Sequence, residues 1–181
     1  GDPINPDDPD KNKSPKYPVG SDVVTKDVTE NITYEGLPAD QTPAKVTKKL
    51  TFNGYGYLDK VTGKWVDAQG NELKDQSIDN ALTWTSNDGT TFAKVTSPYE
   101  REYHIIKVTS HDDGKGSVTA IDGINHDSKD INITVTYAPN GHIVPVTPDP
   151  KDPTKNKEIP GVDHPVFPTD PADPTKVDTN R

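Results

Sequence analysis

The stretch Ile131-Asn-Ile-Thr-Val-Thr-Tyr137 decides the fold class. Apolar and polar residues alternate along it without a break, which predicts a β-strand with one buried face and one solvated face. The same period-2 pattern runs through Val24–Tyr34 and Val46–Phe52, and Tyr103–Val108 is a further strand candidate. Turn signals separate these runs, at 59–63, 68–71, 87–89 and 112–116. No window of twelve or more residues has helical spacing, so a short helix over Asp75–Leu82 is the one helical candidate.

Composition and charge exclude several classes of function. The 181 residues have a net charge of −9, which disfavours binding to nucleic acid because phosphates require clusters of Lys and Arg. There is no cysteine, so disulfides, thiolate nucleophiles and Cys-based zinc sites are excluded. No apolar run is long enough for a membrane span. No Gly-rich phosphate loop and no Gly-x-Ser-x-Gly elbow occurs, and we therefore expect a protein that is not an enzyme.

The uneven distribution of proline predicts the domain boundaries. Of the 18 prolines, five lie in residues 1–20 and ten in 139–181, whereas nearly all the aromatic residues lie between these ranges. A packed core needs large apolar side chains to offset chain entropy, and proline removes donors from a strand ladder. We predict a β domain over 21–138, flanked by a Pro/Asp-rich linker at 1–20 and a Pro/Asp/Thr-rich linker at 139–181.

The flanks also contain related sequences. Asn5–Lys11, Asp149–Lys155 and Thr169–Lys176 all have two Asp-Pro or Asn-Pro steps followed by Lys. Such runs favour polyproline II, so we expect extended spacers, of the kind that join the repeats of a tandem array. Ile143–Val146 and Val166-Phe167 are the points where the second linker is expected to dock.

Five segments, in this order and spacing, resemble the mucus-binding (Mub, or MucBP) repeats of lactic-acid bacteria. They are Val28–Tyr34, Lys45–Phe52, Leu58–Gly63 with Trp84, Thr91–Pro98 and Ile133–Tyr137. The resemblance covers about Lys26–Ala138 and the linkers. It departs from the family after Pro98, where the Gly-Tyr turn common in the family is replaced by Tyr99-Glu-Arg-Glu-Tyr103.

The resemblance implies a module of a surface adhesin of Gram-positive bacteria, secreted, anchored to the cell wall through an LPXTG sorting signal, and located on the extracellular side. The implied partners are mucin glycoproteins and other host glycans, together with neighbouring repeats of the same chain. Two alternatives stay open: a structural spacer that binds nothing, and a binder of host immunoglobulin or matrix protein. For the fold we expect an elongated, immunoglobulin-like β-sandwich, with a β-grasp (ubiquitin-like) sheet and one short helix as the alternative.

Aromatic rings are the candidates for contact with glycans, since they can stack on the C–H faces of sugars. We select Tyr55, Tyr57, Trp65, Tyr99 and Tyr103 as candidate ligand-binding residues. Trp84 is expected to be in the core. The sequence Gly54-Tyr-Gly-Tyr57 is the preferred patch, because glycines beside aromatic residues allow close approach of the backbone, although a bent strand would explain them as well.

No cofactor is expected. Asp88, Asp112 and Asp113 lie in predicted loops and are the weak candidates for a calcium site. Their spacing does not meet the EF-hand pattern, and Asx turns explain them equally well. His111 and His126 each stand beside Asp, and solvated turns explain them better than a divalent metal site does.

Overall fold

The structure, a computed structural model, describes residues 24–180, so the predicted linker at 1–20 lies outside the described residues. The prediction of an all-β protein is confirmed: the described residues form nine strands and a single α-helix of four residues, α1 (Ile78–Ala81). The predicted short helix is therefore present. Two 3₁₀ turns complete the elements, η2 (Ala39–Gln41) and η3 (Pro153–Lys155).

Five strands form the main sheet in the order β5-β2-β1-β7-β6. Their bounds are Val24–Glu35 for β1, Val46–Tyr55 for β2, Thr83–Ser86 for β5, Tyr103–Val108 for β6 and Ile131–Pro139 for β7. Two small hairpins add β3 (Tyr57–Asp59) with β4 (Lys64–Val66), and β8 (Val146–Thr147) with β9 (Lys157–Glu158). β6 is an edge strand of the main sheet.

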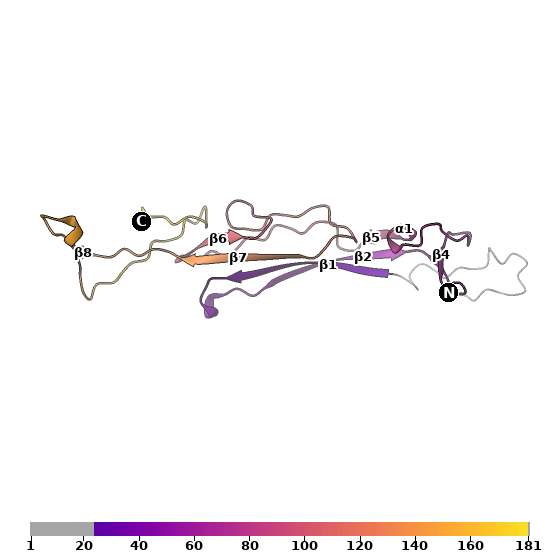
Figure 1. Ribbon diagram of the computed structural model, residues 1–181, viewed down its shortest axis with the longest axis horizontal. Coiled ribbons are helices and arrows are strands. Elements are labelled where there is room, and N and C mark those ends of the chain that lie inside the picture. Colours follow the sequence, from indigo (N-terminus) through magenta and orange to yellow (C-terminus); the bar gives the residue numbers. More distant parts are fainter. Residues whose placement is uncertain (1–23, 181) are drawn as a thin grey trace, which may run out of the picture. The chain divides into compact units, whose positions relative to one another are not determined.

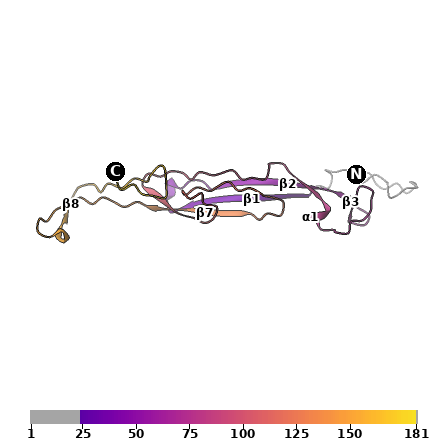
Figure 2. The same ribbon diagram turned by 90° about the horizontal axis from the view of Figure 1, so that it is seen from above.

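The central pair of strands, β1 and β7, runs in parallel. Side-chain contacts between them keep a constant sequence separation of 101 residues, as in Asn31 with Asn132 and Glu35 with Thr136. Between β1 and β2 the separation falls from 28 to 16 along the strands, which is the pattern of an antiparallel pair. The arrows of β1 and β7 point the same way in Figure 1 and that of β2 the opposite way; Figure 2 shows the three strands side by side. The sheet is thus mixed.

The chain divides into two compact units that share the long strands. The described part of unit 1 consists of residues 24–30, 48–92 and 122–131, and unit 2 of residues 31–47, 93–121 and 132–180. In both units the burial of β1 alternates with period 2, as the sequence predicts. The exposed face of the strands is polar, and Thr, Asn and Asp side chains bond across it, as between Thr51 and Asp27 at 2.8 Å.

Each unit has its own apolar core. In unit 1 the buried apolar side chains are those of Val28, Leu50, Phe52, Val66, Leu82, Phe92 and Ile124. In unit 2 they are those of Ile32, Tyr34, Ile105, Val118, Ile121, Ile133, Val135 and Tyr137. Burial raises the pKa of the Tyr137 phenol, whose hydroxyl donates to the carbonyl of Pro98 at 2.6 Å. None of the helices within 24–180 has the length and apolar character that crossing a bilayer requires.

Candidate functional site

Three of the five predicted site residues, Tyr55, Tyr57 and Trp65, lie in neighbouring segments of unit 1. The register pairs Trp65 with Leu58 and Tyr57 with Val66, so the Trp65 ring lies on the opposite face of the β3–β4 hairpin from Tyr57. Tyr55 ends β2, Tyr57 begins β3, and Trp65 lies in β4, the partner strand of β3. A side chain on the intervening Gly56 would lie 3.4 Å from the Trp65 ring, so the ring packs beside the backbone that joins the two tyrosines. All three residues are half-buried, which leaves part of each ring accessible to a ligand.

Gln76 fixes the backbone of Trp65. Its Oε1 accepts the Trp65 N–H at 2.7 Å, and its Nε2 donates to the Trp65 carbonyl at 2.8 Å. The same amide nitrogen donates to the carbonyl of Leu73 at 2.8 Å. The Gln76 side chain therefore supplies the hydrogen bonds that a neighbouring strand would otherwise give. These bonds hold the backbone of Trp65 and do not involve its indole ring.

The glycines of the Gly54-Tyr-Gly-Tyr57 patch accommodate side chains of the protein itself. A Cβ atom on Gly54 would lie 2.8 Å from Leu82 and 2.9 Å from the Trp84 ring, and one on Gly56 would be closest to Leu82. The absence of Cβ atoms at these positions thus lets Leu82 and Trp84 pack against β2. Packing of Leu82 and Trp84 therefore accounts for the two glycines, which is a different cause from the bent strand considered above.

Trp84 belongs to a second cluster in unit 1 that sequence reasoning did not assemble. The Trp84 and His126 rings are stacked, with centroids 4.1 Å apart and planes within 4°. The Trp84 indole N–H donates to the carbonyl of Ile78 at 3.2 Å. The Lys26 ammonium lies 5.4 Å from the Trp84 ring centre, a cation–π distance. Trp84 is half-buried, so it lies at the boundary of the core.

Charged groups complete this cluster. Lys26 Nζ lies 3.3 Å from Asp79 Oδ1 and 3.7 Å from Asp127 Oδ1. His126 Nε2 lies 3.3 Å from a carboxylate oxygen of each of the same two residues. The hydrogen bond from Lys26 lowers the pKa of the Asp79 carboxyl below its usual value.

The charges of this cluster determine what it can bind. Its members are Lys26, Asp79, Trp84, His126 and Asp127. The donor set of His126 with two carboxylates, all within 4.8 Å of one another, could contact a divalent cation. The ammonium of Lys26 already supplies a positive charge beside both carboxylates, so the chain provides its own counter-ion. The arrangement acts as a cross-link of β1, α1, β5 and the segment before β7.

The cluster joins residues as much as 101 positions apart. One signal in the sequence is the pair His126-Asp127, but its interpretation as a solvated turn is wrong for His126, whose side chain is only 16% exposed. The other is Lys26, which interrupts the apolar parity of Val24, Val28 and Ile32. A charged residue at an inward-facing position needs a partner, and the partners here come from three other segments.

The other two predicted site residues, Tyr99 and Tyr103, lie in unit 2. Tyr99 is 44% exposed, and its hydroxyl donates to the carbonyl of Thr169 at 2.7 Å. Tyr103 begins β6, and its carbonyl accepts the Thr169 hydroxyl at 2.5 Å. These residues therefore contact the C-terminal segment of the chain.

The calcium candidates use their carboxylates to accept hydrogen bonds from backbone N–H groups. Asp88 Oδ2 accepts the N–H of Thr51, which lies 37 residues away, at 3.1 Å. Asp112 accepts the N–H of Gly114, and Asp113 accepts that of Lys115, each at 2.8 Å. Burial would raise the pKa of Asp113, but hydrogen bonds from backbone N–H groups and the Lys94 ammonium lower it below its usual value. The Asx turns expected as the alternative are thus present at Asp112 and Asp113, whereas Asp88 bonds to a distant strand.

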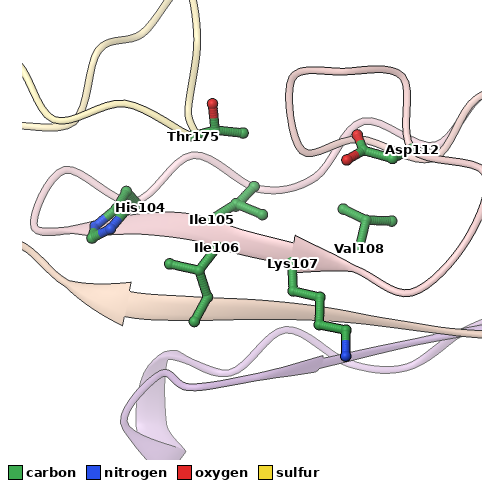
Figure 3. Close-up of a pocket in the computed structure, with 7 residues that line it drawn as sticks. All are labelled: His104, Ile105, Ile106, Lys107, Val108, Asp112 and Thr175. Carbon is green, nitrogen blue, oxygen red and sulfur yellow. The ribbon is translucent and has the colours of Figure 1, made fainter.

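A cavity of about 310 Å³ lies along the edge strand β6 in unit 2. Figure 3 shows the residues that line it, with Thr175 of the C-terminal segment and Asp112 of the 109–118 loop on the same side of β6. The remaining lining residues are the consecutive positions His104–Val108. Among its lining residues the ionisable groups are those of His104, Lys107 and Asp112.

Comparison with solved structures gives three similar chains. The mucin-binding domain of Spr1345 from Streptococcus pneumoniae has 21% identity and a TM-score of 0.43, over 65% of this chain and 94% of that one. Mub-RV has 27% identity and a TM-score of 0.46, over 67% of this chain and 56% of that one. A MucBP domain of LBA1460 from Lactobacillus acidophilus has 22% identity and a TM-score of 0.37, over 65% of this chain and 95% of that one.

No match was found among curated proteins. The Muc B2-like domain family matches residues 19–141, which is more than half of the 181-residue chain. This range includes the predicted domain and all the residues through which the sequence resembles mucus-binding repeats. The chain therefore belongs to the Muc B2-like domain family, as the resemblance predicted.

Proposed function

We propose that this chain is a mucin-binding module of a bacterial surface adhesin and that it binds glycans without transforming them. The observation that carries the proposal is the match of residues 19–141 to the Muc B2-like domain family. The Spr1345 domain is named as mucin-binding, and we extend that role to this chain on the strength of the family match.

Tyr55, Tyr57 and Trp65 are the proposed glycan contacts. Each ring is half-buried, so its inner part is packed while its outer part is available for stacking on a sugar ring. Because Gln76 holds the Trp65 backbone on both sides, the indole is presented from a fixed position and loses little entropy on binding. One such patch binds weakly, and many copies along a surface protein would raise the avidity.

Location on the extracellular side of the cell wall, in tandem with similar repeats, is part of this proposal. The lack of cysteine and the net charge of −9 suit an exposed protein that folds without disulfides and stays soluble. The proposal assigns no role to calcium: the carboxylates of Asp112 and Asp113 accept hydrogen bonds in Asx turns, and that of Asp88 accepts one from Thr51.

The test is binding of the purified chain to immobilised mucin, before and after enzymatic removal of the glycans. We expect saturable binding that deglycosylation abolishes, and at least tenfold weaker binding by Trp65→Ala. The matched control is Val61→Ala, which removes a side chain that is 80% exposed in the β3–β4 hairpin. Val61→Ala should bind as the wild type does.

The two alternative roles give different results in the same experiment. A spacer would bind neither mucin nor deglycosylated mucin, and a binder of host protein would retain immunoglobulin or matrix protein in a pull-down. If Trp65→Ala binds mucin normally while deglycosylation abolishes binding, the proposed function holds and the proposed site is refuted.

A further inference from the structure

The Asp-Pro-x-Asp-Pro-Thr-Lys sequence forms the same closed turn twice in unit 2, at 149–155 and at 170–176. In each copy the side chain of the second Asp accepts both the N–H and the hydroxyl of Thr. These distances are 3.0 and 2.6 Å in the first copy (Asp152 with Thr154) and 3.1 and 2.6 Å in the second (Asp173 with Thr175). Closed turns replace the extended spacers expected here, because the Asp side chains satisfy the N–H groups that polyproline II would leave to water.

The second copy also closes on itself through backbone hydrogen bonds. Thr169 and Val177 form a β-bridge, and Asp170 N–H donates to the carbonyl of Lys176 at 2.9 Å. Asp178 N–H donates to the carbonyl of Pro168 at 2.8 Å. Residues 168–178 therefore form a preorganised loop, which we term the C-terminal loop.

The C-terminal loop docks through Thr169, which is only 1% exposed. Its N–H donates to the carbonyl of Arg101 at 2.8 Å, and its hydroxyl donates to that of Tyr103 at 2.5 Å. The Thr169 hydroxyl also accepts from Asn140 Nδ2 at 2.9 Å, and its carbonyl accepts from the Tyr99 hydroxyl at 2.7 Å. Every polar group of this residue is thus bonded to the rest of unit 2.

A second contact point lies farther along β6. The N–H of Ile105 donates to the carbonyl of Pro174 at 2.9 Å, so the C-terminal loop covers part of the outer edge of this strand. Thr175 then forms one wall of the cavity shown in Figure 3. The Lys115 side chain contributes a favourable charge toward Asp173, whose side chain is 19% exposed.

Comparison of the exposed turn at 149–155 with the docked turn at 170–176 shows which residue is needed for docking to unit 2. It has the same internal hydrogen bonds as the turn at 170–176, and its η3 segment contains no buried residue. The residue before it is Pro148, which has neither the N–H nor the hydroxyl of Thr169. The turn alone is therefore insufficient, and the preceding Thr distinguishes the docked copy from the undocked one.

We propose that the outer edge of β6, with Tyr99 and Asn140, is an acceptor site for the sequence Thr-Asp-Pro-x-Asp-Pro-Thr-Lys, and that the C-terminal loop is a separable ligand of this site. The C-terminal loop of one copy can form the same contacts with the acceptor site of a second copy. Exchange of this loop therefore connects the two copies. Such segment exchange is a low-cost route to association. The exchanged loop follows residues 141–167, whose ends are joined by the backbone hydrogen bonds from Phe167 N–H to Gly141 and from Ile143 N–H to Pro165, and these bonds open when the loop is exchanged.

The test uses the whole chain with a protease site inserted after Gly161, an exposed glycine with no neighbouring atom within 4 Å of its Cβ position. After cleavage we expect the fragment that follows the cut to stay bound to the remainder during size-exclusion chromatography. An isotope-labelled cleaved chain mixed with an unlabelled one should exchange fragments, as measured by native mass spectrometry. Release of the fragment from a folded remainder overturns the proposal, and retention without exchange overturns its second-copy part.

A peptide experiment tests specificity. The chain truncated after Pro168 should bind a labelled peptide of residues 168–180, and its melting temperature should rise when the peptide is added. The Thr169→Val peptide and the natural control peptide 148–156 should bind at least tenfold more weakly. Equal binding of the three peptides overturns the proposed role of Thr169. If the truncated chain does not fold, competition of the same peptides with the retained fragment of the cleaved chain gives the same ranking.

Discussion

Asn140→Ala gives the sharpest test of how the C-terminal segment is held. Asn140 is 3% exposed. Its Nδ2 donates to the carbonyls of Arg101 and Phe167 at 3.1 and 2.7 Å and to the Thr169 hydroxyl at 2.9 Å. Its Oδ1 lies 2.8 Å from His104 Nδ1. The side chain thus links β6, the end of β7 and the C-terminal loop.

The expected loss of stability follows from these contacts. The Nδ2 amide has two hydrogens, so its three acceptors share two donors, and with the Oδ1 contact the side chain makes the equivalent of three hydrogen bonds. A hydrogen bond contributes roughly 0.5–1.5 kcal/mol net, so removing three lowers the free energy of unfolding of unit 2 by about 1.5–4.5 kcal/mol. For a chain of this size each 1 kcal/mol shifts the melting temperature by roughly 2–4 °C, and a decrease of about 6–12 °C is expected for a central value of about 3 kcal/mol. The lower bound applies if water enters the vacated position.

The assay should report on the two units separately. Both tryptophans, Trp65 and Trp84, belong to unit 1, so their fluorescence follows that unit, and hydrogen exchange of residues 98–107 and 166–178 follows the other. We expect Asn140→Ala to lose exchange protection in those two segments. Asn156→Ala is the matched control, because Asn156 is exposed and its side chain accepts one hydrogen bond, from the N–H of Asp149 at 2.7 Å. If Asn140→Ala loses no more stability than Asn156→Ala, the reasoning is refuted.

Three further predictions concern other parts of the molecule. Gly54→Ala places a methyl group 2.8 Å from Leu82, and the strain should cost about 1–3 kcal/mol, measured by urea unfolding. His126→Ala removes the ring stacked on Trp84, which should change the tryptophan fluorescence and cost about 0.5–1.5 kcal/mol beyond the lost burial. The hydrogen bond from the Thr175 hydroxyl lowers the pKa of the Asp173 carboxyl in the folded protein. The ionised Asp173 therefore stabilises the fold above its unfolded pKa, near 3.8, and this stabilisation is lost as the pH falls through the lower folded pKa. Hydrogen exchange should then show the C-terminal loop losing protection in this acidic range.

Each of these predictions has a control. Gly63→Ala has no atom within 4 Å of the new methyl group, so it incurs only the cost of a left-handed backbone, φ +72°, and none of the overpacking. Thr175→Val removes the hydroxyl that lowers the pKa of Asp173 and should weaken the acid effect. For His126→Ala, fluorescence identical to that of the wild type would show that the rings do not stack in solution.

The local structure of this chain could be predicted from the sequence, because burial of one face imposes a period of 2. The strand predicted over 103–108 has the observed bounds of β6, and the strand predicted over 131–137 extends by two residues to Pro139. The turns at 59–63 and 112–116 form where Asp side chains meet backbone N–H groups and where glycines adopt positive φ. These features depend on neighbouring residues alone.

Contacts between distant segments could not be predicted in the same way. The stacking of Trp84 on His126 depends on the paths of four segments, and the parallel pairing of β1 with β7 depends on the topology of the whole sheet. The docking of Thr169 could not be predicted, because the Asp-Pro-rich sequence around it also predicts an extended spacer. Of the candidate ring residues, the structure places Tyr55, Tyr57 and Trp65 in neighbouring segments, with Tyr57 and Trp65 on opposite faces of the β3–β4 hairpin. It places Tyr99 and Tyr103 against the C-terminal loop.

The parallel course of β1 and β7 has a mechanical consequence. Chain entering through β1 and chain leaving through β7 depart from opposite ends of two adjacent strands. A pulling force applied between them is directed along the strands. The force therefore loads the hydrogen bonds between them in shear, so that many must rupture together, whereas strands pulled apart from one end would unzip one bond at a time.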